Sequence, residues 1–374
     1  MKIAIEAQRI FRRDKHGMDL VVLETIRALQ QLDRSNEYFI LVKPGEDRCL
    51  QETENFHLVE VHCSTYPLWE QVALPLSLKR IKPDLVHCTS NTAPLYCPFP
   101  LMLTLHDIIF LEKKSGEMRS LYQRLGRIYR RWVVPRILSN CKRIITVSDY
   151  ERIHILKTLS LDPKAIQTVY NGLDSGFNPS RKDRSIVGKY IPEEPYLFFL
   201  GNTDPKKNSL NTFKAYGLYL RKSQRKLPLL VADLEEPVID AMLAREKLTD
   251  IKSHLYFPGY IANSDLPYLY TAAFAFLYPS LRESFGLPLL EAMASGVPVV
   301  TSNAAAIPEV AGTGALLTDP ADPEAIAHAL IALEENPALY EAQVRYGLNR
   351  ASAFSWEDTA RRLLEHYQSF MPVS

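Results

Sequence analysis

The sequence predicts an α/β protein with two parallel-sheet domains in tandem, and three observations support this class. Short apolar runs alternate with amphipathic stretches along the chain, as expected for parallel sheets flanked by helices. Between residues 175 and 195 the composition shifts to Pro, Ser, Arg, Lys and Asp without periodicity, which indicates a boundary. The length of 374 residues is sufficient for two large cores.

The first series of elements predicts an N-terminal domain over residues 1–180. We expect its strands at 2–7, 38–42, 57–61, 85–87, 101–105 and 143–147. Residues 18–32 place apolar side chains at helical spacing. Ser148 and Glu151 form a capping box that opens a helix through residue 159.

The second series predicts a C-terminal domain over 196–355, after a linker at 181–195. We expect strands at 196–200, 229–232, 255–257, 274–278 and 297–302. Pro288, Gly296 and Pro298 delimit a short helix at about 287–295. A final amphipathic helix spans 356–370.

Composition excludes several classes of protein. The chain has 44 Lys and Arg against 43 Asp and Glu, so its net charge of +1 gives no reason to expect a nucleic acid partner. Its apolar runs are far shorter than the roughly 18 residues that cross a bilayer. Glu6 interrupts the first apolar run too early for a signal peptide. Five cysteines without a C-x-x-C pair indicate reduced, buried thiols and a cytoplasmic location.

The most informative segment is 278–298, where a strand ends just before the short helix. This order places Glu283 at the carboxyl end of a strand, where open α/β sheets bind ligands. The backbone N–H groups of Phe285, Gly286 and Leu287 open the helix and attract phosphate. Glu291 follows in a helix of small and apolar residues, where a carboxylate needs a partner. Taken alone, Glu291 could simply complement the helix dipole or pair with a basic neighbour.

Two glutamates separated by seven residues around a Phe-Gly-Leu-Pro turn resemble the E-x7-E signature of retaining glycosyltransferases. The chain resembles glycosyltransferase family 4, also called group 1, over nearly its whole length. The resemblance implies the GT-B fold, in which two Rossmann-like parallel-sheet domains face a cleft. It implies that the first domain holds the acceptor and the second the nucleotide sugar, with the last helix packing back on the first domain.

Other segments resemble the loops with which this family holds its donor. Segment 257–261 is similar to the part near the base and ribose, and segment 201–208 to the diphosphate loop. Loop 104–107 resembles the one that faces the donor sugar, and 16–19 the glycine-containing N-terminal loop. The donor-side residues implied in this way are Gly17, His106, Asp107, Asn202, Lys206, Lys207, Gly259 and Tyr260.

The resemblance also assigns roles. It implies that Glu291 holds the ribose hydroxyls and that Glu283 lies beside the transferred sugar, where His106 and Asp107 complete the catalytic set. Asn202 stands where many relatives carry Arg, which indicates a rearranged grip on the diphosphate. Taken alone, Lys206 and Lys207 could be a solvated loop, and His106 a packed core histidine.

The expected donor is a nucleotide sugar, with GDP-mannose preferred on likeness to bacterial mannosyltransferases and UDP-sugars left open. No cofactor or metal is expected, because the chain has no D-x-D pattern to chelate one. The expected activity is transfer of a hexose to a saccharide or lipid-linked saccharide, with retained configuration, in bacterial surface polysaccharide or glycolipid synthesis.

Rival functions remain on the same scaffold. A dinucleotide oxidoreductase is excluded, because no G-x-G-x-x-G follows the first strand. A phosphorylase, an epimerase and a degenerate sugar-nucleotide-binding scaffold remain open. The scaffold alternative is suggested by Asn202 and by the single glycine of loop 16–19.

Residues 113–143 carry ten Lys or Arg and one acid, Glu117. One helical face there carries Leu121, Leu125, Ile128, Trp132 and Pro135, as in an interfacial helix drawn to anionic lipid. A solvated arginine face over an ordinary core stripe is the equal alternative. The sequence therefore leaves open a peripheral contact with the inner face of a membrane.

Overall fold

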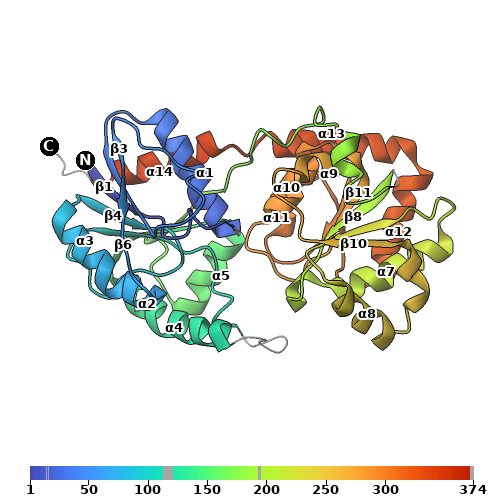
Figure 1. Ribbon diagram of the computed structural model, residues 1–374, viewed down its shortest axis with the longest axis horizontal. Helices are drawn as coiled ribbons and strands as arrows, with labels where there is room; N and C mark the ends of the chain where they lie inside the picture. The colour runs from blue at the N-terminus through green and yellow to red at the C-terminus, as the bar shows by residue number, and fades with distance from the viewer. Residues whose placement is uncertain (14, 16, 113–120, 193–194, 371–374) are drawn as a thin grey trace. The chain divides into compact units, whose positions relative to one another are not determined.

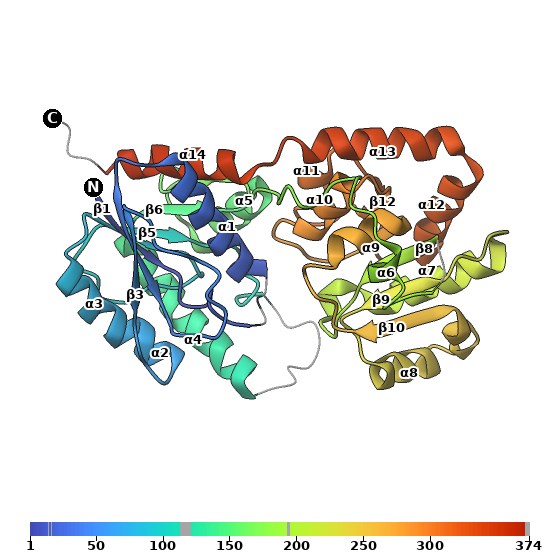
Figure 2. The same cartoon turned by 45° about the horizontal axis from the view of Figure 1, so that its top comes forward.

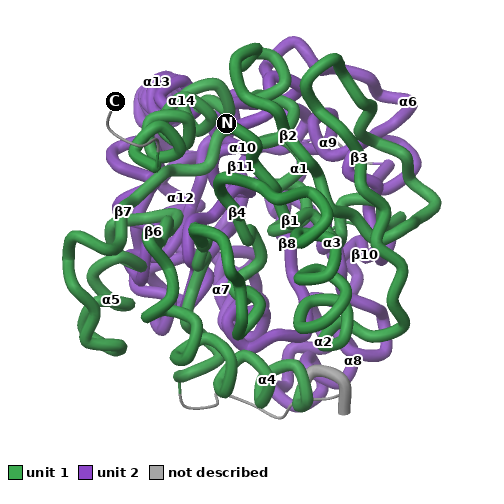
Figure 3. Tube along the Cα trace, turned by 90° about the vertical axis from the view of Figure 1, so that its left-hand side faces the viewer, with its two compact units in different colours: residues 1–172, 355–374 green, residues 173–354 purple. Residues whose placement is uncertain are grey.

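The computed structural model describes residues 1–13, 15, 17–112, 121–192 and 195–370. They form two compact units, of which unit 1 comprises residues 1–172 and 355–374 and unit 2 comprises residues 173–354 (Figure 3). Each unit is built on one parallel sheet with helices, so the predicted fold class is confirmed. We predicted a linker at residues 181–195. Its described residues, 181–192 and 195, lie within unit 2 and include a short helix, α6 (Arg184–Val187).

The sheet of unit 1 has the order β3-β2-β1-β4-β5-β6-β7, and all its described pairings are parallel. Figure 1 labels its strands β1, β3, β4 and β6. Its strands are β1 (Lys2–Glu6), β2 (Glu37–Val42), β3 (Phe56–Glu60), β4 (Leu85–Cys88), β5 (Leu101–Thr104), β6 (Cys141–Thr146) and β7 (Ile166–Thr168). The six predicted strands all form, and β7 was not predicted.

Helices cover both faces of this sheet. They are α1 (Gly17–Leu32), α2 (Tyr66–Leu68), α3 (Leu74–Ile81), α4 (Leu121–Ile137), α5 (Asp149–Leu159) and α14 (Trp356–Gln368), with a π-helical turn at Trp69–Ala73 and a 3-10 turn at Leu138–Asn140. Ile3 and Ile5 of β1 pack into the core beside α1 and α14, whereas Ala4 packs into the opposite core with Trp69 and Val133. This alternation follows from the two-residue period of a strand.

One predicted helix start is confirmed at atomic detail. The hydroxyl of Ser148 accepts a hydrogen bond from the backbone N–H of Glu151 at 3.2 Å, which caps α5. The helix α1 includes the predicted span. The last helix, α14, packs along α1 in unit 1 (Figure 2).

The sheet of unit 2 has the order β10-β9-β8-β11-β12-β13 and is also parallel. Its strands are β8 (Tyr196–Leu200), β9 (Leu229–Ala232), β10 (Leu255–Gly259), β11 (Ala273–Tyr278), β12 (Val299–Ser302) and β13 (Leu316–Thr318). Besides α6, its helices are α7 (Ser209–Lys222), α8 (Glu236–Arg245), α9 (Leu266–Ala272), α10 (Leu287–Ala294), α11 (Ile307–Ala311), α12 (Pro323–Glu335) and α13 (Pro337–Ala351), with 3-10 turns at Pro205–Lys207 and Thr249–His254.

The sequence predicts that no segment crosses a bilayer and that the cysteines are reduced and buried. Among the described residues, no helix combines the length and the apolar character needed to cross a bilayer. All five cysteines are free, but only Cys88 is buried and the other four are partly exposed. The expectation of buried thiols is therefore correct for Cys88 alone.

Candidate functional site

The strand order of unit 2 reverses between the neighbours β8 and β11. Ligands of open parallel sheets bind outside the carboxyl ends of the strands at such a point. The loops after β8 and β11 are joined there by a hydrogen bond from the Leu281 N–H to the Lys206 carbonyl at 2.7 Å. The buried Asn208 side chain adds a second link, because it donates to the Pro279 carbonyl at 2.9 Å.

Lys207 and Glu283 meet at this position. The Lys207 Nζ lies 2.8 Å from the Glu283 Oε1 and donates to the Tyr278 hydroxyl at 3.1 Å. The side chains of Lys207 and Glu283 are only 16% and 12% exposed. Lys207 is therefore held inside the site and is not part of a solvated loop.

The charge of Glu283 is set by its basic neighbours. Burial alone would raise the pKa of Glu283, but the ammonium groups of Lys207 and Lys206 outweigh that effect and lower it. Glu283 is therefore a carboxylate at neutral pH. The pair places one fixed negative and one fixed positive charge at the carboxyl edge of the sheet.

The helix α10 starts a few residues later. Gly286 precedes it with a φ of 103°, and a Cβ at this position would lie 3.2 Å from the Ile307 Cδ1. Both the backbone conformation and the crowding therefore favour glycine. Phe285 is buried beside it and contacts the ring of Phe354 edge-on. The first N–H groups of α10, beginning with Leu287, have no carbonyl within the helix to bind, as at any helix start.

Glu291 has a different environment. It accepts a hydrogen bond from the hydroxyl of the buried Tyr270 at 3.2 Å. Burial raises the pKa of Glu291 to about 7; the Tyr270 hydrogen bond opposes this shift, and the negative charge of Asp174 adds to it. Glu291 can therefore change its charge near neutral pH.

Lys206 and Asn202 shape the loop after β8. The Lys206 Nζ lies 3.8 Å from the Asp204 Oδ2, and the Asn202 Oδ1 accepts from the Asp204 N–H at 2.8 Å. Asn202 thus uses its side-chain oxygen within its own loop. Gly201 before it is also constrained, since a Cβ there would lie 2.7 Å from the Leu234 Cδ1.

Gly259 and Tyr260 lie at the end of β10, on the edge of the same sheet. Gly259 has a φ of 77° and its carbonyl accepts from the Asp233 N–H at 2.9 Å, which joins the ends of β10 and β9. The Tyr260 side chain is 61% exposed. In the strand order these residues are two strands away from β8, so the structure does not place them against the Lys207–Glu283 pair.

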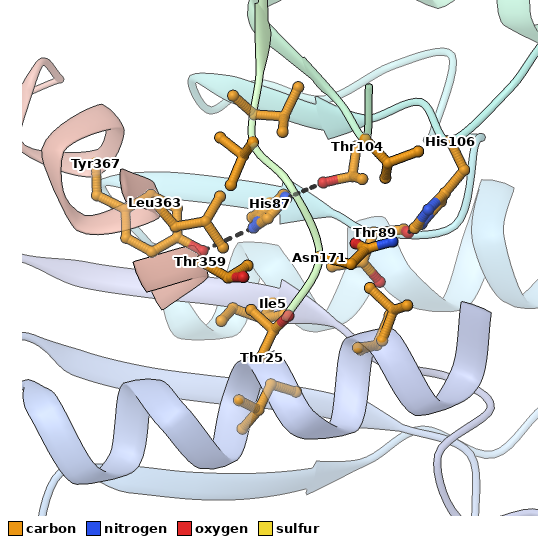
Figure 4. Close-up of a pocket in the computed structure, with 16 residues that line it drawn as sticks. Ile5, Thr25, His87, Thr89, Thr104, His106, Asn171, Thr359, Leu363 and Tyr367 are labelled. Atoms are coloured by element: carbon orange, nitrogen blue, oxygen red, sulfur yellow. Dashed lines mark hydrogen bonds between the residues drawn. The ribbon is translucent and has the colours of Figure 1, made fainter. Parts of the chain in front are cut away.

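His106, Asp107 and Gly17 belong to unit 1. His106 is buried after β5, and its Nε2 lies 2.9 Å from the Thr89 carbonyl oxygen (Figure 4). Burial lowers the pKa of His106, so its ring is neutral at pH 7. Asp107 accepts the Ile109 N–H at 3.0 Å, and Gly17 is the exposed first residue of α1. His16, which precedes Gly17 in the predicted loop, lies outside the described residues.

A small cavity of about 30 Å³ lies beside His106 in unit 1, and sequence reasoning did not find it. His87 borders it between the hydroxyls of Tyr367 and Thr104, each 2.7 Å from one ring nitrogen (Figure 4). Burial lowers the pKa of His87 to about 3, with a smaller contribution from His106. The cavity has room for about one water molecule, so we assign it a structural role.

Sequence reasoning also missed the tyrosines that serve the two glutamates. Tyr278 ends β11 and contacts Lys207 through both its hydroxyl and its ring, whose centroid is 4.7 Å from the Nζ. Tyr270 lies in α9 and is buried. The sequence indicated that Glu291 needs a partner, but it did not identify Tyr270 as that partner.

Two family models match the chain and together span most of it. Residues 182–350 match "Glycosyl transferases group 1", and residues 16–177 match "Glycosyltransferase Family 4".

The chain is similar to several curated bacterial transferases. It is 34% identical to "O-antigen chain mannosyltransferase B" of Escherichia coli over 62% of this chain and 61% of that protein. It is 27% identical to "O-antigen chain mannosyltransferase RfbU" of Salmonella typhimurium, over 73% of this chain and 70% of that protein. For the serotype-specific mannosyltransferase WbdA of Escherichia coli the match spans only 39% of that protein.

Solved structures at low identity share the fold over nearly the whole chain. The sucrose-phosphate synthase from Thermosynechococcus elongatus has a TM-score of 0.77 at 19% identity and covers 98% of both chains. Anabaena HepE, solved with UDP, has a TM-score of 0.75 at 17% identity over 99% of this chain and 100% of that one. WaaG, a glycosyltransferase involved in lipopolysaccharide biosynthesis, has a TM-score of 0.72 at 16% identity over 97% of this chain and 99% of that one. These likenesses establish the GT-B fold that was predicted.

Proposed function

Because this chain belongs to the group 1 glycosyltransferases of family 4, we propose that it transfers a hexose from a nucleotide sugar to a saccharide or lipid-linked saccharide. The Lys207–Glu283 pair at the strand reversal of unit 2 is the observation that carries the proposal. It supplies a buried cation next to a helix start, which suits a diphosphate.

In the proposed reaction the bond between the anomeric carbon and the diphosphate oxygen breaks, and a bond from that carbon to an acceptor oxygen forms. The acceptor proton moves to an oxygen of the departing diphosphate. Negative charge therefore grows on the diphosphate while the sugar becomes oxocarbenium-like. Charged and N–H donors fixed before the reaction stabilise that change, and the loss of one costs about 3 kcal/mol, or about a hundredfold in rate.

Lys207 is suited to this task. An ammonium has three donors, so Lys207 can keep its bonds to Glu283 and Tyr278 and donate a third to a phosphate oxygen. Lys206 and the backbone N–H groups of Phe285, Gly286 and Leu287, which lead into α10, would contact the same diphosphate. Glu283 would face the sugar, where its fixed negative charge stabilises a developing positive centre.

Glu291 is proposed to hold the ribose. An ionised carboxylate accepts two hydrogen bonds from a vicinal diol, and a charged acceptor makes such bonds about twice as strong. His106 and Asp107 would act on the donor sugar from unit 1, and Gly17, Asn202, Gly259 and Tyr260 would contact the nucleotide. The reaction needs no metal in this scheme, so a chelator should leave turnover unchanged.

Mannose from GDP-mannose is the proposed donor group, supported by the curated names of the bacterial relatives. The solved HepE complex contains UDP, so a UDP-sugar is the alternative. Retention of the anomeric configuration is part of the proposal and follows if the acceptor attacks from the face that the diphosphate leaves.

A thermal-shift panel of GDP-, UDP- and ADP-sugars tests the proposal, because a ligand that binds the native state raises its melting temperature. We expect one nucleotide to give a clear shift, largest for GDP-mannose. The same sugar nucleotide should then be consumed in a transfer assay with labelled sugar. The absence of a shift with all of these donors at millimolar concentration would refute a donor site.

Peripheral membrane contact is proposed for α4. Leu125, Ile128 and Trp132 are 57%, 63% and 50% exposed, so the apolar stripe of this helix is not a core stripe. Basic residues accompany it on the same helix, as in interfacial helices drawn to anionic lipid. The basic residues at 113–120 lie outside the described part of the chain. We expect salt-sensitive sedimentation with phosphatidylglycerol vesicles and none with neutral vesicles; absence of binding at low salt would refute the contact.

A further inference from the structure

We propose that a basic pocket in unit 1 binds the phosphate-bearing head of an amphiphilic acceptor. The pocket has a volume of about 1000 Å³ and lies between the loops after β1 and β2 and the helices α2 and α4. This volume is at the upper end of that of small-molecule sites. The inference rests on the proposed function in one respect, the identification of the bound amphiphile as the acceptor.

The charge of the pocket favours an anion. Arg12, Arg13 and Lys43 line it against one acid, Glu46. All four side chains are exposed, so they can reach a ligand. Arginine forks and lysine ammonium groups bind phosphate through charge-assisted hydrogen bonds. The excess of positive charge is local, because the whole chain is nearly neutral.

The two basic loops are fixed to each other. The Lys43 N–H donates to the Gln8 carbonyl at 3.2 Å, and the Asp47 N–H donates to the Phe11 carbonyl at 3.3 Å. A Cβ at Gly45 would lie 2.1 Å from the Phe11 carbonyl oxygen, so only glycine permits this approach. The buried Lys15 side chain forms an ion pair with Asp47. The backbones of the two loops that carry Arg12, Arg13 and Lys43 are therefore fixed to each other beside the pocket.

The pocket also has an aromatic part, which is fixed by hydrogen bonds. Tyr66 and Tyr129 line the pocket, with ring centroids 5.9 Å apart in an edge-on contact. Both hydroxyls donate to the carboxylate of Glu70, which is 1% exposed and also accepts from Thr92. Glu70 thus joins the π-helical turn, α2, α4 and the loop after β4. Aromatic faces of this kind pack against sugar rings or hydrocarbon.

The pocket is continuous with apolar surface. Leu125 lines it and is 57% exposed, and Leu68, next to the lining residue Pro67, is 51% exposed. Two rows of exposed apolar side chains continue from these points, one on α4 and one along α2 to α3. The row on α4 continues with Ile128 and Trp132, and the row from α2 to α3 continues with Val72 and Leu76. A ligand with a charged head and an apolar tail fits a basic pocket that adjoins exposed apolar side chains.

Calorimetric titration of the full chain with geranyl diphosphate, inorganic diphosphate and geraniol tests the assignment. We expect geranyl diphosphate to bind at least tenfold more tightly than either part alone. The double variant Arg12→Glu/Lys43→Glu should weaken that binding at least tenfold. Lys79→Glu/Arg80→Glu, which reverses two exposed charges on α3, is the matched control and should change it less than twofold.

The donor site could also take a diphosphate, so Lys207→Ala is titrated in parallel. Binding that survives Lys207→Ala and is lost in the Arg12/Lys43 variant supports the pocket. Binding lost only in Lys207→Ala, equal loss in the control, or equal affinity for inorganic diphosphate would overturn it. A nucleotide thermal shift that persists in the Arg12/Lys43 variant would leave the proposed function standing. If geranyl diphosphate binds but no nucleotide sugar gives a thermal shift, the pocket is supported and the proposed glycosyltransferase function is not.

Discussion

The two glutamates of the segment 283–291 have different surroundings in unit 2, and their pKa values shift in opposite directions. Glu283 lies against the ammonium of Lys207, which with Lys206 outweighs the effect of burial and keeps the pKa low. Glu291 lies against the neutral hydroxyl of Tyr270, where burial raises the pKa to about 7. The comparison shows that the partner decides whether a buried carboxylate is permanently ionised or can still titrate.

The strongest test of the contrast is Glu283→Ala. If Glu283 serves the reacting sugar, transfer should fall by about a hundredfold or more, because a fixed charge near the developing positive centre is lost. Affinity for the nucleoside diphosphate should stay within a few-fold. Parallel measurement of turnover and of nucleoside diphosphate binding separates the two effects. Equal losses in both would contradict a role at the sugar.

Glu291→Ala should instead reduce nucleotide binding itself. If the carboxylate holds the ribose hydroxyls, its removal should abolish the thermal shift given by the best nucleotide sugar. Glu309→Ala, a change of a glutamate in the next helix, α11, is the control for loss of a carboxylate nearby. A full shift in the Glu291 variant would refute the ribose role.

The pH dependence of nucleotide binding should distinguish the two carboxylates further. Only ionised Glu291 can accept both ribose hydroxyls, so affinity should rise about tenfold between pH 6 and pH 8, as the group passes its pKa of about 7. Glu291→Gln should remove this component and leave only the titration of the nucleotide phosphate. Calorimetry at three pH values measures it, and identical pH profiles of the two proteins would show that Glu291 is not the titrating group.

The smallest expected effect comes from Tyr270→Phe. The hydroxyl of Tyr270 lowers the pKa of Glu291, so its loss should move the midpoint of the pH profile upward. The hydrogen bond contributes about 1 kcal/mol, which corresponds to less than one pH unit. Tyr268→Phe, two residues earlier in α9, is the matched control. A downward shift would contradict this assignment of the hydrogen bond.

The pattern of apolar residues and the positions of proline and glycine were sufficient to predict most of the fold. The strands with four or more residues form near the predicted positions, because each contains a run of apolar residues. Most of these runs are buried in their sheet, whereas β3 and β10 are largely half-buried. The strands β7 (Ile166–Thr168) and β13 (Leu316–Thr318) were missed, since three residues carry no measurable alternation. Pro288 and Gly296 marked α10 closely because both residues have strict backbone requirements.

The candidate site was predictable only in part. Spacing within one segment identified Glu283 and Glu291, but their partners depend on distant chain segments. Lys207 reaches Glu283 across 76 residues and Tyr129 reaches Glu70 across 59. Contacts of this kind arise from strand order and helix packing, which a linear pattern does not encode. The basic pocket was missed for the same reason.

The return of the last helix to unit 1 has a consequence for biosynthesis. Tyr367 of α14 bonds to His87 across 280 residues of sequence and belongs to the core that includes Ile3 and Ile5. During translation the ribosome therefore completes every strand of unit 2 before it delivers the closing helix of unit 1. The core of unit 1 can therefore be completed only at the end of translation. A nascent protein stalled before residue 355 would expose the apolar surface of β1 and α1 against which α14 packs.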